Sequence, residues 1–136
     1  MERIDWNPSF SVGVRLLDQQ HEQIVAMINL LISEPGGGTV RSETISELLT
    51  KLTMYASDHF LAEERLLEEH RYPALASQQG DHKAYRLKIV ALCRDTMDYK
   101  DSVPAELLEF MKEWWIRHIL ETDMQYRSFL VERGVK

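Results

Sequence analysis

The stretch His59-Phe60-Leu61-Ala62-Glu63 decides the fold prediction, because it places a histidine and a glutamate four residues apart. Residues four apart lie on the same face of an α-helix. The same face carries apolar residues at steps of three and four, the pattern of a helix that turns one side into a bundle. An ionised glutamate is rarely buried without a partner, so a metal ion is the predicted partner of Glu63. The residues of this stripe are Ile45, Leu48, Leu52, Tyr55, His59, Glu63 and Leu66.

Length and composition indicate one globular domain with a sizeable core. The chain has 136 residues, of which 44% are hydrophobic and 28% are charged. The net charge of -6 argues against nucleic acid or an anionic membrane as a partner. The single cysteine, Cys93, excludes an internal disulfide and argues against a thiolate metal cluster, which fits a cytoplasmic location. No apolar run approaches membrane-spanning length, so no membrane partner is expected.

The remaining periodicity predicts an all-α fold, namely an up-down-up-down antiparallel four-helix bundle with an irregular N-terminal arm. One domain is expected over residues 1–136, and the arm is expected over residues 1–17. Asp18 is the predicted N-cap of the first helix. The four helices are expected over about 18–33, 40–70, 74–99 and 104–130.

Each predicted helix carries one histidine on its apolar stripe. A single histidine in such a position is more often a packed residue with one hydrogen bond than a ligand. Four histidines, one on the apolar stripe of each of four helices, favour a metal site, since burying ionisable groups without a cation would be costly. His70 lies among charged residues at the end of its helix and is left out. The candidate ligands are His21, His59, His82 and His118, with the carboxylates Glu63 and Asp123.

This set of ligand types favours a dinuclear iron site. Imidazole and carboxylate ligands without thiolates suit iron, zinc or manganese. More than four ligands exceed a usual tetrahedral zinc site, and two carboxylates could bridge two metals. A ferritin-like site is disfavoured, because no histidine has a glutamate three residues earlier. A zinc-protease motif is also absent, since Val25 stands where a motif starting at His21 needs its second histidine.

The spacing of His118 and Asp123 predicts a distortion in the last helix. The two residues are five apart, which on an ideal helix separates them by roughly 140°. If both bind one cluster, the helix must change its pitch there, as a π-bulge does. The alternative is that Asp123 is a surface residue of the last turn.

Four motifs along the chain resemble those of bacterial hemerythrins. They are Val12-Gly-Val-Arg-Leu-Leu-Asp-Gln-Gln-His21, His59-x-x-x-Glu63-Glu64, Tyr72-Pro73 and Trp114-x-x-x-His118-Ile119-x-x-x-Asp123. The resemblance covers nearly the whole chain. It implies a four-helix bundle that holds two iron ions, as an oxo- or hydroxo-bridged diiron site, and binds dioxygen.

The resemblance also implies roles for individual residues. The implied ligands are His21 and His59 at the iron with the open dioxygen site, His82 and His118 at the other iron, and Glu63 and Asp123 as bridges. The implied apolar oxygen pocket consists of Ile24, Trp114 and Ile119. Such a pocket keeps water from bound dioxygen and slows its loss as superoxide or peroxide. Plain core packing is the alternative for these three residues, and both roles can hold together.

One position departs from the family pattern. The third helix of the family usually carries His-x-x-x-His shortly after Tyr-Pro, and here Gln78 stands in place of the first histidine. Gln78 still lies one turn before His82 on the same face. Three outcomes are open: Gln78 binds iron through its amide oxygen, it hydrogen-bonds a water in the site, or one metal is bound poorly. We hypothesise that the change favours faster autoxidation or peroxide-type turnover over durable oxygen storage.

The leading functional prediction is a protein that binds dioxygen for storage, delivery or sensing, with a reductase or a separate signalling protein as a partner. The alternative is a diiron redox enzyme that works as a peroxidase, an oxidase or a nitric-oxide-handling protein. The lost histidine keeps this alternative open. A metal store or a structural metal site is the third reading. Tyr126, one turn beyond Asp123, could hydrogen-bond near the cluster or relay electrons, but packing is favoured for it.

Overall fold

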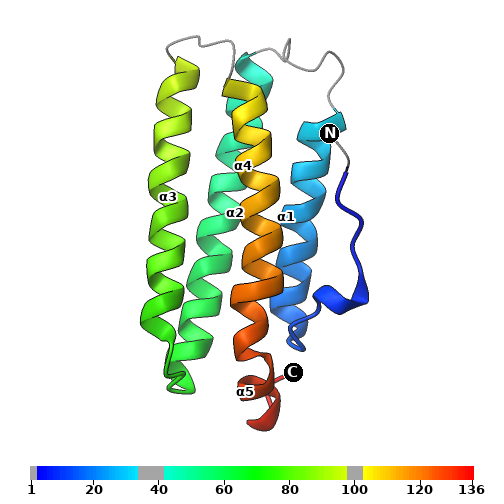
Figure 1. Ribbon diagram of the computed structural model, residues 1–136, viewed down its shortest axis with the longest axis vertical. Helices are drawn as coiled ribbons and strands as arrows, with labels where there is room; N and C mark the ends of the chain where they lie inside the picture. The colour runs from blue at the N-terminus through cyan, green and yellow to red at the C-terminus, as the bar shows by residue number, and fades with distance from the viewer. Residues whose placement is uncertain (1–2, 34–41, 98–102) are drawn as a thin grey trace.

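The computed structural model describes residues 3–33, 42–97 and 103–136 of the chain. The long helices lie side by side, and the chain runs up, down, up and down through them (Figure 1). This confirms the predicted all-α bundle. The elements in order are η1 (Pro8–Phe10), α1 (Arg15–Ser33), α2 (Ser42–Glu69), α3 (Leu75–Met97), α4 (Val103–Arg117), η2 (His118–Asp123) and α5 (Met124–Glu132).

The helices form a closed ring around one interior. Helix α1 packs against α2 and α4, and α3 packs against the same two helices from the opposite side. No β-strand occurs in the described ranges. No helix within them is long and apolar enough to cross a membrane.

The interior is built in layers along the bundle. One apolar cluster includes Ile24, Phe60 and Trp115, and a second includes Leu17 and Tyr126. A layer of buried polar side chains separates the two clusters along the chain on α1, α2 and α4. The polar layer lies one or two helical turns from one end of the bundle, the end at which α2 connects to α3.

The inward stripe of α2 follows the prediction except at one position. Leu52, His59 and Glu63 are buried, but Tyr55 is 43% exposed, so its predicted inward position is wrong. The inward row passes through Ala56 instead, because position 56 lies closer to the centre of the face that Leu52 and His59 share. The side chains of Ile45 and Leu48 lie outside the described part of the structure.

The first helix begins earlier than the predicted boundary. The backbone N–H of Asp18 donates to the carbonyl of Val14 at 3.0 Å, so Asp18 lies inside the first turn of α1 and is not its N-cap. Its carboxylate instead accepts hydrogen bonds from Ser11 Oγ and from the backbone N–H of Val12. Gly13, at φ 81°, turns the chain between these two segments in a conformation that favours glycine.

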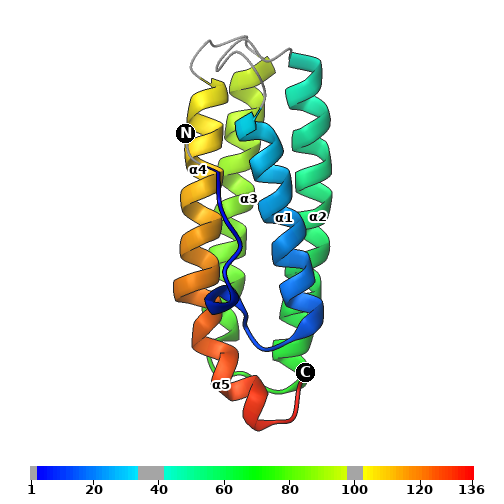
Figure 2. The same ribbon diagram turned by 90° about the vertical axis from the view of Figure 1, so that its right-hand side faces the viewer.

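The N-terminal arm packs along the bundle and does not add a helix to it. It runs beside α1 and α4 in Figure 2. The backbone of Ile4 exchanges two hydrogen bonds with the side-chain amide of Asn29 on α1, at 2.7 and 2.8 Å. Ile4 is buried in the larger apolar cluster, so the arm closes one side of the core.

The connection from α2 to α3 is a helix stop followed by proline. Arg71 has φ 57°, and the N–H of Tyr72 donates to the carbonyl of Leu67 at 2.9 Å. This is the hydrogen-bond pattern of a Schellman motif. The predicted break before residue 42 and the predicted end of the third helix at residue 99 lie outside the described residues.

Candidate metal centre

The six predicted ligands come together in the polar layer, and each is at most 1% exposed. Helices α1, α2, α3 and α4–η2 each supply one histidine. The side chains form two groups that share Glu63 and could each hold a metal ion. The first group is His21, His59, Glu63 and Asp123, and the second is Glu63, His82 and His118.

In the first group the nitrogen and oxygen atoms face a common point. His21 Nε2 lies 3.0 Å from His59 Nε2 and 3.0 Å from Asp123 Oδ2. His59 Nε2 lies 3.3 Å from Glu63 Oε2.

The second group uses the other oxygen of each carboxylate. Glu63 Oε1 lies 2.9 Å from His82 Nε2 and 3.5 Å from His118 Nε2. Asp123 Oδ1 lies 3.0 Å from His118 Nε2. Glu63 and Asp123 therefore each direct one oxygen toward either group, which is the arrangement of bridging carboxylates.

The hydrogen bonds on the outer side of the rings determine what the inner nitrogens present. His82 Nδ1 donates to Glu64 Oε2 at 2.9 Å, and His118 Nδ1 donates to Asp81 Oδ2 at 2.7 Å. In the neutral form that a metal ligand needs, an imidazole has one N–H; the outer carboxylate accepts it, and Nε2 keeps a lone pair for a metal. These Nε2 atoms face the carboxylate oxygens of Glu63 at 2.9 and 3.5 Å. Nitrogen and carboxylate oxygen atoms at such distances share positive charge, which is supplied either by a proton on Nε2 or by a metal ion that both groups bind.

Several polar atoms of the layer have no hydrogen-bond partner among the described residues, which fits a bound metal ion. They include His118 Nε2 and both carboxylate oxygens of Asp123, all buried. Ligands about 2.1 Å from one metal and at right angles to each other lie about 3.0 Å apart. The distances of Asp123 Oδ1 and Oδ2 to the histidine nitrogens are 3.0 Å. The residues present therefore fit a bound metal better than a hydrogen-bonded polar core.

The predicted distortion between His118 and Asp123 is confirmed. Residues His118–Asp123 form the π-helix η2 between α4 and α5. Both end residues are buried, so the alternative of a surface position for Asp123 is wrong. The wider turn brings residues five apart onto one face, as the site requires.

Burial and neighbouring charges act in opposite directions on the titratable groups. Burial alone would raise the pKa of Glu63, but the histidines around it, His59 first, hold the pKa well below its usual range. Burial alone would lower the pKa of His118, but Asp123 and other carboxylates raise the pKa well above its usual value. The Glu63 carboxylate therefore stays ionised at neutral pH, and its buried negative charge favours a cation.

Tyr126 contacts the site directly. Its hydroxyl donates to Glu63 Oε2 at 2.8 Å. Burial, Asp123 and Glu63 raise the pKa of Tyr126 well above its usual value, so the hydroxyl keeps its proton and stays a donor. The predicted packing role is confirmed, since Tyr126 is buried in the smaller apolar cluster, and the predicted hydrogen bond near the site is found as well.

Gln78 is buried beside the π-helix. Its side-chain Nε2 donates to the backbone carbonyl of Thr122 at 3.3 Å. Its Oε1 is buried without a hydrogen-bond partner among the described residues. An unpartnered amide oxygen one turn before His82 is a potential oxygen donor for a metal.

The predicted oxygen-pocket residues are all part of the larger apolar cluster. Ile24, Trp114 and Ile119 are buried next to the histidines of α1 and α4–η2. Trp114 stacks on His118 with ring centroids 4.4 Å apart, and Phe60 stacks on His82 at 3.9 Å. One aromatic ring thus stacks on each of these two histidine rings.

Sequence reasoning missed the outer partners of the histidines. Glu64 on α2 binds His82 on α3, Asp81 on α3 binds His118 on α4–η2, and Gln20 on α1 accepts from His59 Nδ1 on α2 at 2.8 Å. Each partner directly precedes or follows a predicted ligand in the sequence. That adjacency is the available signal, since neighbouring polar positions on a helix flank the inward face.

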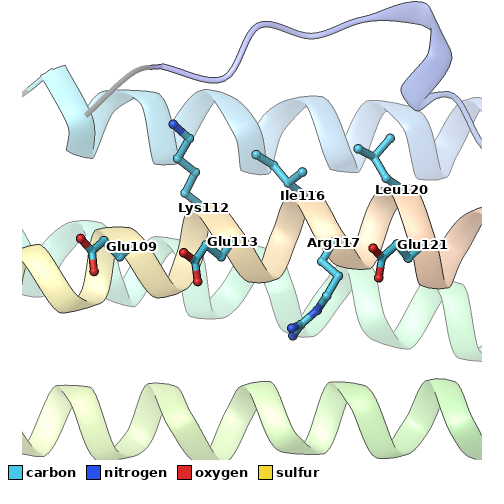
Figure 3. A pocket seen from close by; sticks show the side chains of 7 residues that line it. All are labelled: Glu109, Lys112, Glu113, Ile116, Arg117, Leu120 and Glu121. Atoms are coloured by element: carbon cyan, nitrogen blue, oxygen red, sulfur yellow. The ribbon is translucent and has the colours of Figure 1, made fainter.

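A surface groove lies on the outward side of α4 and η2 (Figure 3). None of the predicted ligands lines it. The groove is therefore separate from the buried polar layer. Its lining residues are Glu109, Lys112, Glu113, Ile116, Arg117, Leu120 and Glu121.

A family model described as the hemerythrin HHE cation binding domain matches residues 12–130. The chain belongs to the hemerythrin family. It is therefore a non-haem iron protein of the type that binds dioxygen. This hemerythrin is 32% identical in sequence to a hemerythrin-like protein of Naegleria gruberi, over 93% of this chain and 92% of the relative.

Other relatives and a solved structure agree with this assignment. A bacteriohemerythrin of Stenotrophomonas maltophilia is 28% identical over 93% of this chain and 80% of its own length. The crystal structure of a leucine-to-alanine mutant of hemerythrin has the same fold, with a TM-score of 0.83 and 24% identity. That match covers 94% of this chain and 97% of the other.

Proposed function

We propose that this hemerythrin holds two iron ions, one in each group of ligands, and binds dioxygen reversibly. His21 and His59 would bind one iron, and His82 and His118 would bind the other. Glu63 and Asp123 would bridge them, since each directs its two oxygens to different groups. The observation that carries the proposal is the set of buried imidazole Nε2 atoms that face oxygens of one shared carboxylate, Glu63, at 2.9 to 3.5 Å.

Two ferrous ions would supply the electrons that dioxygen takes up on binding. The protein would contribute a dry enclosure, since Ile24, Trp114 and Ile119 are buried in the larger apolar cluster. Low polarity disfavours the release of a charged species such as superoxide. The proposed role of these three residues is therefore to keep water from the bound gas.

The working environment is also part of the proposal. A single cysteine and the absence of a thiolate site fit a reducing cytoplasm, where the ferrous state is easier to maintain. A reductase would return oxidised protein to the ferrous state. A separate signalling protein would be needed if the domain acts as a sensor.

The test is the iron content of the purified chain, measured together with its visible spectrum. The reduced protein is cycled between nitrogen and air. Two irons per chain and an absorption band that appears in air and disappears under nitrogen would support a dioxygen carrier. One-way oxidation would move the assignment to a redox enzyme or a sensor. One iron per chain without an oxygen-dependent band would overturn the proposal.

Gln78 favours the redox enzyme as the second candidate function. An amide oxygen is a weaker donor than an imidazole, so a ligand at this position is easier to displace. The replacement Gln78→His should restore an imidazole and slow autoxidation, on the order of tenfold. The rate is measured as the decay of the oxygen-dependent band in air. An unchanged rate in this variant, with full iron content, would count against a role of Gln78 in oxidation.

A further inference from the structure

The two proposed metal positions have nearly matched inner ligands, but their outer hydrogen bonds differ in charge. Around His82 and His118, both outer partners are carboxylates, Glu64 and Asp81. Around His59, the partner is the neutral amide of Gln20. The outer nitrogen of His21 is buried without a hydrogen-bond partner among the described residues.

An anionic partner on the outer nitrogen makes an imidazole a stronger ligand. The carboxylate pulls the Nδ1 proton toward itself, which increases electron density at Nε2. A neutral amide does this less, and an unpartnered N–H does not do it at all. The structure therefore gives two strengthened imidazoles to the position of His82 and His118, and none of comparable strength to the other position.

Tyr126 increases the difference. Its hydroxyl donates to Glu63 Oε2, the oxygen that faces His59. A hydrogen bond withdraws charge from that oxygen, so it becomes a weaker donor for a metal there. Glu63 Oε1 faces His82 at 2.9 Å, and within the described part of the chain no hydroxyl donates to it.

Solvent reduces this effect without removing it. The side chains of Glu64 and Asp81 are 21% and 31% exposed, so water screens part of their charge. Arg86 lies 3.9 Å from Glu64 but is half exposed, so it neutralises that carboxylate weakly. The short bonds to the rings, at 2.9 and 2.7 Å, keep the direct influence on the imidazoles.

We propose that Glu64 and Asp81 are positioning residues that make the His82–His118 position the tighter metal site, which fills first, while the His21–His59 position binds its metal more weakly. This inference rests on the proposed pair of metal positions. By strengthening His82 and His118 as ligands, the two carboxylates would also offset the metal affinity that is lost because Gln78 stands in place of an imidazole.

The experiment is a titration of the chelator-treated protein with Zn²⁺ alone, monitored by competition with a chromophoric chelator. Zinc has no redox chemistry, so the readout is independent of oxygen binding. We expect two separable binding steps in the unaltered chain. The variant His118→Ala should remove the tight step and His21→Ala the weak step, which assigns each step to its position.

The outer partners are then changed without altering their shape. Glu64→Gln and Asp81→Asn should each weaken the tight step by about 10- to 100-fold and leave the weak step nearly unchanged. Gln20→Glu places a carboxylate on His59 and should strengthen the weak step by about tenfold. A gain of affinity cannot come from misfolding, so this variant keeps the test decisive. The matched control is Asp58→Asn, an exposed carboxylate beside His59.

The outcomes separate this inference from the proposed function. Equal affinities in the unaltered chain, or unchanged steps in both Glu64→Gln and Asp81→Asn, would overturn the grading of the two positions. An iron-loaded protein that binds dioxygen but has equal zinc affinities would overturn only the grading. Two graded zinc steps in a protein that forms no oxygen-dependent band would support the grading and count against dioxygen binding.

Discussion

Two segments of the molecule each supply one histidine and one carboxylate to the centre, but they do so with different geometry. In α2, His59 and Glu63 are four residues apart on a regular helix. In η2, His118 and Asp123 are five apart on a π-helix. The first spacing costs the backbone nothing, because four residues are close to one helical turn. The second requires a local change of helix type, so the backbone of α4 is adapted to the site.

The two carboxylates also differ in how many groups they hold. Glu63 lies within 3.9 Å of all four histidines and accepts from Tyr126. Asp123 contacts His21 and His118, each at 3.0 Å. The regular helix therefore carries Glu63, the carboxylate that contacts all four histidines and is called the hub below. The π-helix adds Asp123 as the second bridge. The position of Glu63 affects every histidine of the centre, so its backbone must be held most firmly, and a regular helix is the more rigid support.

The largest effect is expected from removing the hub. Glu63→Ala deletes one oxygen from each group, so both positions lose a ligand and the chain should lose both irons. Asp123→Ala should retain part of the iron, because fewer contacts depend on it. Iron per chain after dialysis against a weak chelator measures both variants.

The control for this comparison is Glu68→Ala, an exposed glutamate of the same helix. It should bind as much iron as the unaltered chain. If Asp123→Ala lost more iron than Glu63→Ala, the assignment of Glu63 as the hub would be wrong.

A smaller effect is expected from making the two segments alike. Removing the exposed residue Glu121 places His118 and Asp123 four positions apart, as His59 and Glu63 are in α2, so η2 should become regular α-helix. The carboxylate then moves along the axis by up to about 1.5 Å, the rise of one residue. Such a shift takes the Asp123 carboxylate out of the geometry that the metal needs, so zinc affinity should fall at least about tenfold at both positions.

The same deletion should stabilise the protein once metal has been chelated. A regular helix replaces the less favourable π-helix, so the melting temperature should rise by a few degrees, on the order of 4 °C. Circular dichroism melts with a chelator present measure this. The control is the substitution Glu121→Ala, which keeps the residue count and should change neither quantity. Tighter metal binding in the deletion variant would contradict the view that the π-helix serves the site.

The contrast between α2 and η2 also explains what sequence reasoning could reach. The pair His59 and Glu63 obeys helical periodicity, so its side chains could be placed on one face directly. The pair His118 and Asp123 breaks that periodicity. The distortion could still be predicted, because two candidate ligands at an impossible spacing imply a changed helix. The roles of these residues as iron ligands stay predictions that the metal experiments test.

Other features depended on contacts that periodicity does not encode. Glu64 and Asp81 occupy half-buried flanks of their helices, and the sequence gives no sign of which neighbouring histidine each would bind. The rotation of α2 about its axis decides that Ala56 and not Tyr55 faces inward, and only packing against other helices fixes that rotation. Asp18 resembles an N-cap in sequence, but the arm supplies donors for its carboxylate, so the helix begins one turn earlier.

The smallest effect is expected from the contact that joins the two segments. The hydroxyl of Tyr126, on the helix that follows η2, donates to Glu63 on α2 at 2.8 Å. The variant Tyr126→Phe keeps the ring and leaves a buried, charged oxygen without this donor, which should cost about 1–2 kcal/mol. For a chain of this length that lowers the melting temperature by roughly 5 °C.

This loss should depend on metal. With Zn²⁺ bound, a cation faces the same oxygen, so the missing hydrogen bond matters less and the difference in melting temperature should shrink by about half. With metal chelated, the full difference should appear. Tyr55→Phe, at an exposed tyrosine of α2, is the matched control and should melt like the unaltered chain in both conditions. Equal losses with and without zinc would mean that Tyr126 supports the packing of α5 and does not act on Glu63. In that case α5 would have no link to Glu63 through Tyr126, and the effect of removing Glu121 would have to arise from the displacement of Asp123 alone.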